Sequence, residues 1–443
     1  MNIKKKLCLL AVTTVVFSGA ANYHLSVKAD GESTAEGEST LIVTPEVNTP
    51  AISKGKAEKA SYIVWNNAEQ NDGFEVWVKA KDSKTYKKVT AGNFTEFSVS
   101  NLKPGRVYKI KIRGYKETDG KTVMGQYSNV IENVVTNVEL KRANALGASS
   151  AVVKWKKGKD ISGYYIQYSD NKIFKDAKAV KISKADINNK NIYDLLSNKK
   201  YYVRIRTYKE NNKKKYYSAW SKCTKFKTKK ISSIVNGDFK STSGFFKDSV
   251  FFGDSVLSGL GIYTKSKGRG YLDGAKVDGV ISYSLIEALK PNSKFHPLYR
   301  GKHLAPENVA KIMEAKKVFL FFGINDVYNT KNPKQAYVNY VKLIDRIKAE
   351  CPETKIYILS TTYPVKSHEG SSTLAKNLKK LNKYMIKYCE KSDCEYVDIA
   401  TYISTSDGYL KKQYCSDDFI HQNIPTYAIW DKVLRNYASN KKK

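Results

Sequence analysis

Two stretches of the chain alternate apolar and polar residues with a period of two, and the second stretch repeats the first. The segment Gly-Phe-Glu-Val-Trp-Val at residues 73–78 aligns with Gly-Tyr-Tyr-Ile-Gln-Tyr at residues 163–168. Residues 108–115 align in the same way with residues 201–208. Alternation of this kind predicts strands with one buried face. A repeat of about ninety residues, with Gly and Asn turns between short strands, predicts two tandem β-sandwiches.

Three further positions in each repeat support this prediction. An early tryptophan is followed by a leucine placed six residues before a tyrosine: Trp65, Leu102 and Tyr108, then Trp155, Leu195 and Tyr201. The leucine–tyrosine spacing is similar to the tyrosine corner of such sandwiches. The repeats resemble fibronectin type III modules, which we expect at residues 51–136 and 137–230. This resemblance implies a fold and names no ligand, so a spacer or a weak wall-binding module is the expected role.

After about residue 230 the pattern changes, and short apolar runs alternate with long amphipathic segments. The runs predict strands at residues 250–253, 318–322, 356–360 and 396–399. The amphipathic segments predict helices at residues 333–350, 371–389 and 425–438. Strand–helix alternation favours a parallel sheet flanked by helices. We expect this α/β domain to occupy residues 240–443.

Polar motifs follow the apolar strands of this last domain. Gly253-Asp254-Ser255 ends the first strand, and Gly323-Ile324-Asn325-Asp326 ends the second. Parallel sheets bind ligands beyond the carboxyl ends of their strands, so Ser255 and Asn325 are expected at one rim. Each motif alone is also an ordinary turn, because Gly, Asn, Asp and Ser suit turns.

A serine nucleophile needs a base beside its hydroxyl and an acid that orients the base. Of the four histidines after residue 29, His421 alone has an acid three residues before it, namely Asp418. Residues at this spacing share a face in a helical turn, which places Asp418 against His421. Asn325 and the Ser255 N–H would then donate to an oxyanion. Ser255, Asp418 and His421 are therefore the expected catalytic residues.

These motifs resemble the GDSL, or SGNH, hydrolase family over about residues 245–440. The resemblance implies a three-layer flavodoxin-like fold and cofactor-free hydrolysis of esters through an acyl-serine. It also implies a glycine N–H in the oxyanion hole beside Ser255 and Asn325. Gly279 is the expected glycine, with Gly274 as its rival.

The N-terminus predicts export. Three lysines at positions 4–6 precede an apolar stretch and a Val-Lys-Ala ending at residue 29, as in a secretory signal. Residues 30–50 are rich in Glu, Ser, Thr and Pro and are expected to be a flexible linker. No later segment reaches transmembrane length, so we expect a secreted protein without a membrane span, extracellular or associated with the cell surface.

Positive charge is concentrated in the second repeat. The chain has a formal net charge of +35. Residues 137–230 contain 25 basic and 7 acidic residues, a net of +18, whereas residues 30–136 contain 15 and 14. A segment this basic attracts polyanions, and in an exported protein an anionic cell-wall polymer is a better candidate than nucleic acid. A lysine-rich composition of the whole proteome would explain the charge equally well.

The cysteines and the possible metal ligands in the sequence do not point to a further kind of site. Five cysteines follow residue 29, so at least one thiol is free or paired between chains, and the pairing is open. No Cys-x-x-Cys or His-Glu-x-x-His motif is present, so no metal is expected.

The sequence as a whole predicts an exported serine esterase that removes acetyl or other short acyl groups from cell-wall or extracellular carbohydrate. Three alternatives remain open at this point. The first is a surface-binding or adhesive protein with an inert hydrolase-like domain. The others are an acyltransferase and a lipid esterase that use the same triad.

Overall fold

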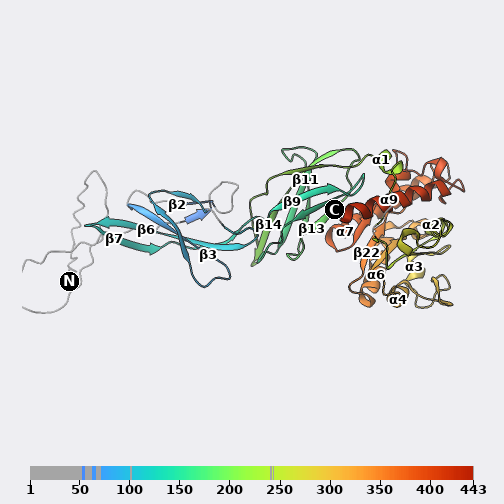
Figure 1. Cartoon of the computed structure of the whole chain (residues 1–443), viewed down its shortest axis with the longest axis horizontal. Coiled ribbons are helices and arrows are strands. Elements are labelled where there is room, and N and C mark those ends of the chain that lie inside the picture. Colours follow the sequence, from blue (N-terminus) through green and yellow to red (C-terminus); the bar gives the residue numbers. More distant parts are fainter. Residues whose placement is uncertain are drawn as a thin grey trace, which may run out of the picture. The chain divides into compact units, whose positions relative to one another are not determined.

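The computed structural model describes residues 52–54, 62–65, 71–99, 102–239, 242 and 244–442 (Figure 1). The expected signal and linker at residues 1–50 lie outside this range. The chain divides into two compact units. One comprises the residues up to Thr136 together with Lys209–Ala219, and the other comprises Asn137–Tyr208 and Trp220–Lys443. None of the helices in the described ranges combines the length and apolar content needed to cross a bilayer.

The first repeat forms a β-sandwich. One sheet has the order β1 (Ile52–Lys54), β2 (Tyr62–Trp65), β5 (Glu96–Ser98). The other has the order β4 (Lys87–Gly92), β3 (Gly73–Ala80), β6 (Val107–Thr118), β7 (Lys121–Tyr127), and β8 (Ile131–Val135) also pairs with β6. Trp65 packs edge-on against Phe74 between the sheets, as the alternating pattern predicts.

The second repeat forms a second sandwich. Its smaller sheet has the order β13 (Asn189–Ile192), β10 (Ala151–Trp155), β9 (Leu140–Ala145). Its larger sheet has the order β12 (Lys178–Ile182), β11 (Gly163–Ser169), β14 (Lys200–Asn211), β15 (Lys214–Tyr217), and β16 (Thr224–Lys227) also pairs with β14. Trp155 and Tyr164 are buried against each other in the core.

Both sandwiches contain the expected tyrosine corner. The hydroxyl of Tyr108 accepts the N–H of Lys103 at 2.9 Å, and the hydroxyl of Tyr201 accepts the N–H of Leu196 at 2.9 Å. In each sandwich the tyrosine lies near the start of a long central strand, and its hydroxyl binds the backbone five residues before it. The two repeats therefore share this hydrogen bond at equivalent positions.

The C-terminal domain is a five-stranded, fully parallel sheet. Its strand order is β18 (Lys276–Gly279), β17 (Ser249–Gly253), β21 (Lys317–Phe321), β22 (Lys355–Leu359), β23 (Glu395–Val397). The residues of β17 are all buried, which is typical of a strand covered on both faces. Aromatic rings stack along the sheet. The ring centroids of Phe251 and Phe319 lie 4.2 Å apart, and those of Phe319 and Tyr357 lie 4.6 Å apart.

Helices cover both faces of this sheet and give three layers (Figure 1). They are α1 (Ile231–Val235), α2 (Ser255–Ser266), α3 (Leu285–Ala288), α4 (Pro306–Ile312), α5 (Ile324–Thr330), α6 (Pro333–Glu350), α7 (Ser371–Lys391), α8 (Ala400–Ile403) and α9 (Ile424–Lys442). Helix α2 packs against α9, and α6 packs against α7. Short connecting elements are η1 (Tyr271–Gly274), β19 (Leu298–Tyr299), β20 (Lys302–His303) and η2 (Lys412–Tyr414). The predicted strands and helices thus differ from the observed ones only near their ends.

The second sandwich and the C-terminal domain share one hydrophobic core. Leu146, Ala148, Val152 and Tyr193 of the sandwich belong to the same buried cluster as the residues of the parallel sheet. The ring of Tyr193 packs edge-on against Tyr396 of β23, and its hydroxyl accepts the N–H of Tyr396. The second sandwich is consequently a structural part of the C-terminal unit. A spacer or a weak wall-binding module was expected from the sequence, and this shared core was not anticipated.

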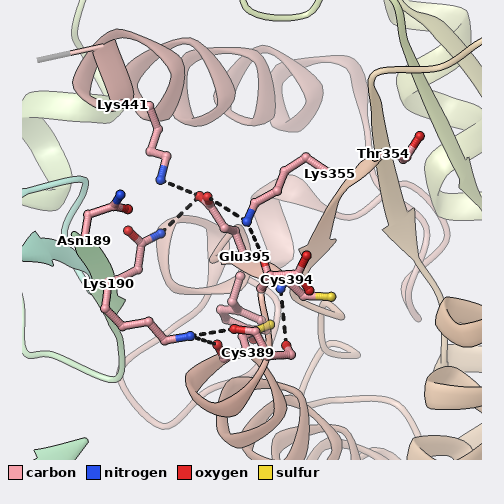
Figure 2. A network of polar contacts seen from close by, with 12 residues as sticks. Asn189, Lys190, Thr354, Lys355, Cys389, Cys394, Glu395 and Lys441 are labelled. Carbon is pink, nitrogen blue, oxygen red and sulfur yellow. Dashed lines mark hydrogen bonds and ion pairs between the residues drawn. The ribbon is translucent and has the colours of Figure 1, made fainter. Parts of the chain in front are cut away.

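Polar contacts reinforce this interface (Figure 2). The ammonium of Lys190 donates to the carbonyl oxygens of Cys389 and Ser392 at 2.7 and 2.6 Å, where α7 ends. A cation at this position complements the partial negative charge of a helix C-terminus. Asn191 donates to Glu395 at 3.1 Å, and Ser149 donates to Asp398 at 2.6 Å. These partly buried hydrogen bonds add directional contacts to the apolar packing between the two domains.

Candidate active site

Ser255 stands where strand β17 passes into helix α2. Asp254 is the N-cap of that helix, and its side chain accepts the N–H of Val256 at 2.9 Å. Ser255 is therefore the first helical residue, and its own N–H is one of those that lack an intrahelical acceptor. Its hydroxyl oxygen lies 3.0 Å from Nε2 of His421, which is hydrogen-bonding distance. The structure thus places the expected nucleophile and base in contact.

The acid that contacts His421 is Asp417. Oδ2 of Asp417 lies 2.5 Å from Nδ1 of His421, and its Oδ1 accepts the N–H groups of Phe419, Ile420 and His421 at 2.9–3.0 Å. The predicted contact between Asp418 and His421 is wrong. Ser255, His421 and Asp417 form one chain of hydrogen bonds.

The physical reason lies in the backbone of this loop. The prediction assumed a helical turn, in which residues three apart share a face. Asp418 instead has a φ of 55°, in the left-handed region, and is exposed. The chain folds around the Asp417 carboxylate as an Asx turn, so the residue four before His421 faces its ring.

Hydrogen bonding keeps Asp417 ionised. Burial by itself would raise its pKa, but hydrogen bonds from His421, from the N–H groups of Phe419 and Ile420 and from Cys415 lower the pKa of Asp417 to about 2. A carboxylate in this state orients the imidazole and stabilises its cation without titrating near neutral pH. The thiol of Cys415 lies 3.3 Å from Oδ1 of Asp417.

Asn325 is the second residue of helix α5, just after strand β21. The N-cap of α5 is Gly323, whose φ of 110° favours glycine. A Cβ atom at this position would also lie only 2.4 Å from Cδ2 of Leu381. The Asn325 amide donates to the carbonyl oxygen of Tyr283 at 3.0 Å. An asparagine amide has two N–H groups, so one orients the side chain and the other remains for a ligand.

Two buried aspartates shape the rim. Asp326 accepts the N–H of Leu285 at 3.0 Å at the start of α3, and burial raises its pKa to about 6. Burial raises the pKa of Asp254 to about 7, and its Oδ2 has no hydrogen-bond partner among the described residues. Each carboxyl group links the end of a strand to the start of a helix. Among the described residues, neither forms a hydrogen bond with the side chain of Ser255 or His421.

Gly279 lies at the same edge of the sheet as Ser255. It ends strand β18 and pairs in register with Gly253, the residue at the end of β17. A Cβ at Gly279 would lie 2.0 Å from the N atom of Ser258, so α2 requires a glycine here. Gly274 precedes β18 and therefore lies toward the opposite edge of the parallel sheet. The geometry favours Gly279 over its rival.

An aromatic surface adjoins the triad and was not anticipated from the sequence. The ring of His368 stacks on Phe419 with centroids 4.0 Å apart, and Phe419 lies 5.7 Å from Tyr328. Tyr328 is 46% exposed and follows Asn325 by three residues, on the same helix. Phe419 lies inside the His421 motif, so its position was a usable signal. We call Tyr328, Phe419 and His368 the aromatic surface.

Neither metals nor disulfides are evident in the described part of the chain. No group of three or more His, Cys, Asp or Glu residues there could hold a metal ion. The five cysteines of the described ranges are all free thiols, including Cys389 and Cys394.

Two family models match parts of the chain. The model of the GDSL-like Lipase/Acylhydrolase family matches residues 251–429, which include Ser255, Asn325, Asp417 and His421. The C-terminal domain is a GDSL-like acylhydrolase. It makes the chain a carboxylic ester hydrolase. The Fibronectin type III domain model matches residues 135–224, the second sandwich.

Solved structures of the same kinds resemble the acylhydrolase and its sandwiches. A GDSL-like lipase from Bacteroides thetaiotaomicron is 14% identical, with a TM-score of 0.35, over 47% of this chain and 95% of that one. The FN1–FN3 domains of chicken CNTN1 are 19% identical, with a TM-score of 0.20, over 42% of this chain and 69% of that one. No curated protein sequence matches the chain.

Proposed function

We propose that this chain is an exported serine esterase that removes acetyl or other short acyl groups from cell-wall or extracellular carbohydrate. The hydrogen-bonded series Ser255, His421 and Asp417 carries the proposal. A hydroxyl, an imidazole and an ionised carboxylate in this order are the components of acyl transfer to serine.

The proposed reaction has two halves. Ser255 Oγ attacks the ester carbonyl carbon while Nε2 of His421 takes the hydroxyl proton, and Asp417 stabilises the resulting imidazolium. The N–H groups of Ser255 and Gly279 and the amide of Asn325 bind the oxyanion. His421 then protonates the leaving alcohol oxygen. A water molecule, deprotonated by His421, hydrolyses the acyl-serine and releases the carboxylic acid.

The aromatic surface supports carbohydrate as the substrate. Tyr328 is exposed beside the triad, and the stack of His368 on Phe419 continues from it. Flat rings offer an apolar face that suits the C–H face of a pyranose, with the polar hydroxyls left at the edge. The N-terminal signal expected at residues 1–29 supports export to extracellular glycans.

Hydrolysis by the Ser255→Ala variant tests the chemistry. The purified protein is assayed on p-nitrophenyl acetate and on p-nitrophenyl octanoate. Loss of the nucleophile is expected to lower kcat/KM on the acetate by at least about 10³-fold. Activity of the variant equal to that of the wild type would exclude the proposed nucleophile, and a preference for the octanoate would contradict a short acyl group.

Tyr328 tests the substrate class. On acetylated xylo-oligosaccharide, Tyr328→Ala is expected to raise KM about fivefold, because the sugar ring loses one stacking partner worth about 1 kcal/mol. Its kcat/KM on p-nitrophenyl acetate is expected to stay within about twofold, and Tyr328→Phe, which keeps the ring, serves as the control. An equal effect of Tyr328→Ala on both substrates would contradict a sugar-binding role.

A further inference from the structure

The loop at residues 280–284, between strand β18 and helix α3, links the segments that carry the proposed oxyanion donors. We call it the rim loop. The N–H of Val280, directly after β18, donates to the carbonyl oxygen of Gly253 at 3.0 Å, at the end of β17. The carbonyl oxygen of Tyr283 accepts the side-chain amide of Asn325 at 3.0 Å. The direction in which this amide points therefore depends on where the rim loop holds the Tyr283 carbonyl group.

The side chain of Tyr283 anchors the rim loop in the protein interior. It is only 1% exposed, and its ring packs edge-on against Phe322 with centroids 5.4 Å apart. Phe322 directly follows strand β21 and precedes Asn325 by three residues. Tyr283 thus contacts the segment that carries Asn325 at two points, once through its ring and once through its carbonyl oxygen.

The Tyr283 hydroxyl has one buried partner, the imidazole of His296. Its oxygen lies 2.9 Å from Nδ1 of His296, which is 2% exposed. Nε2 of the same ring lies 2.9 Å from the carbonyl oxygen of Lys290. A carbonyl oxygen only accepts, so Nε2 carries a hydrogen, and Nδ1 of the neutral ring is an acceptor. The Tyr283 hydroxyl therefore donates to His296, and both ring nitrogens have defined partners.

We propose that Tyr283 and His296 are positioning residues for the esterase reaction. The hydrogen bond between their side chains fixes the rim loop, and the Tyr283 carbonyl oxygen then aims the Asn325 amide at the oxyanion. This inference rests on the oxyanion role proposed for Asn325. Neither side chain forms a hydrogen bond with Ser255 or His421 within the described ranges, so both act through Asn325 and not on the reacting atoms.

The role predicts a loss in kcat and not in KM. The oxyanion develops only on the way to the transition state, so a donor turned away from it slows the chemical step and leaves ground-state binding unchanged. A side chain that merely stabilises the fold would lower the melting temperature without this selective loss. The two readouts are therefore measured together on every variant.

Steady-state kinetics on p-nitrophenyl acetate and thermal unfolding of the full chain test the proposal. Tyr283→Phe removes the hydroxyl and keeps both the ring and the carbonyl group. His296→Leu removes the acceptor, whereas His296→Asn keeps a side-chain acceptor close to the position of Nδ1. The matched control is Tyr164→Phe in the second sandwich. Tyr164 is also buried, and its hydroxyl donates to the carbonyl oxygen of Ala185 at 2.7 Å.

Tyr283→Phe and His296→Leu are expected to lower kcat at least about fivefold, with KM within about twofold of the wild type. His296→Asn is expected to restore kcat to within about twofold, because the hydroxyl again has an acceptor. Tyr164→Phe is expected to lower the melting temperature, since it also loses a buried hydrogen bond, and to keep kcat within about twofold.

A double-mutant cycle shows whether Tyr283 acts through Asn325. In the Asn325→Ala background, Tyr283→Phe is expected to lower kcat by less than about twofold, because the amide that it positions is gone. Ser255→Ala and Asn325→Ala alone separate this inference from the proposed function. If both of these single variants lose activity while Tyr283→Phe keeps the wild-type kcat, only the positioning role is overturned. Full activity of Asn325→Ala would overturn the oxyanion role and the positioning role together.

Three further results would overturn the positioning role. The first is a loss from Tyr283→Phe that is just as large in the Asn325→Ala background. The second is an equal loss of kcat in the Tyr164→Phe control, which would indicate general destabilisation. The third is an equal loss in His296→Asn and His296→Leu. Tyr283→Phe, which deletes a single oxygen atom, decides the matter if the His296 variants fail to fold.

Discussion

Oδ2 of Asp417 lies 2.5 Å from Nδ1 of His421, while its neighbour Asp418 occupies the left-handed region of the backbone and is exposed. Adjacent aspartates thus have different surroundings. One receives three backbone N–H groups and the imidazole, and the other receives none of these. This difference separates two substitutions that are otherwise chemically identical.

Asp417→Asn is expected to lower kcat on p-nitrophenyl acetate by about 10⁴-fold, because an amide does not hold the required imidazole tautomer. Asp418→Asn is the matched control and is expected to stay within about threefold of the wild type. Steady-state kinetics of the two variants, side by side, check this. If Asp418→Asn were the inactive one, the acid of the triad would be Asp418 after all.

Asn325→Ala is expected to lower kcat by about 10²–10³-fold with little change in KM, because the amide acts mainly on the oxyanion. The loss of its hydrogen bond to the Tyr283 carbonyl could also shift the loop after β18. Thermal unfolding separates the two effects, since a catalytic role leaves Tm nearly unchanged. A rise in KM at constant kcat would instead assign Asn325 to ground-state binding.

Lys190→Met is expected to destabilise the interface between the second sandwich and the acylhydrolase. The two carbonyl oxygens that accept from its ammonium would be left without this donor, at a cost of about 1–3 kcal/mol. Chemical unfolding measures the loss, and kcat on p-nitrophenyl acetate is expected to stay the same. Lys184→Met, at an exposed lysine of the same sandwich, is the control. Equal stability of the two variants would show that Lys190 does not stabilise this interface.

Asp254 gives a prediction about pH. Its pKa is raised by burial to about 7, so its contribution to stability is full below its ordinary pKa and is lost as pH rises through about 7. Asn caps helices as well as Asp does and carries no charge. The Tm of Asp254→Asn minus that of the wild type is therefore expected to increase between pH 4 and pH 8. The corresponding free-energy change is on the order of a few kcal/mol. A difference that does not change with pH would contradict a carboxyl group whose pKa is raised by burial.

The sequence alone was enough to predict that Ser255, Asn325 and His421 belong to the site. Ser255 and Asn325 each follow a strand exit, and parallel strands bring their exits to one edge. His421 was identified by elimination among four histidines. Asp417 was missed because the choice between two adjacent acids depends on the φ of Asp418, which spacing does not reveal. Helical spacing is a poor guide inside an Asx turn.

The shared core could not be predicted for a different reason. Periodicity indicates that a residue is buried, but it does not indicate which neighbour buries it. Leu146 and Tyr193 fit the interior of an isolated sandwich equally well. Their actual partners, such as Tyr396, lie two hundred residues away in the sequence, beyond the reach of a local pattern.

The single core that joins the second sandwich to the acylhydrolase also limits how this gene can evolve. Modules of this type are easily duplicated or lost when each one is bounded by linkers on both sides. Here, deletion of residues 137–230 would expose the apolar surface around Tyr396 and Tyr437 to water. An extra module inserted between the two would separate the same surfaces. The part of this chain that must be kept together therefore contains both the second sandwich and the acylhydrolase, and the interface between them leaves no place for a further module.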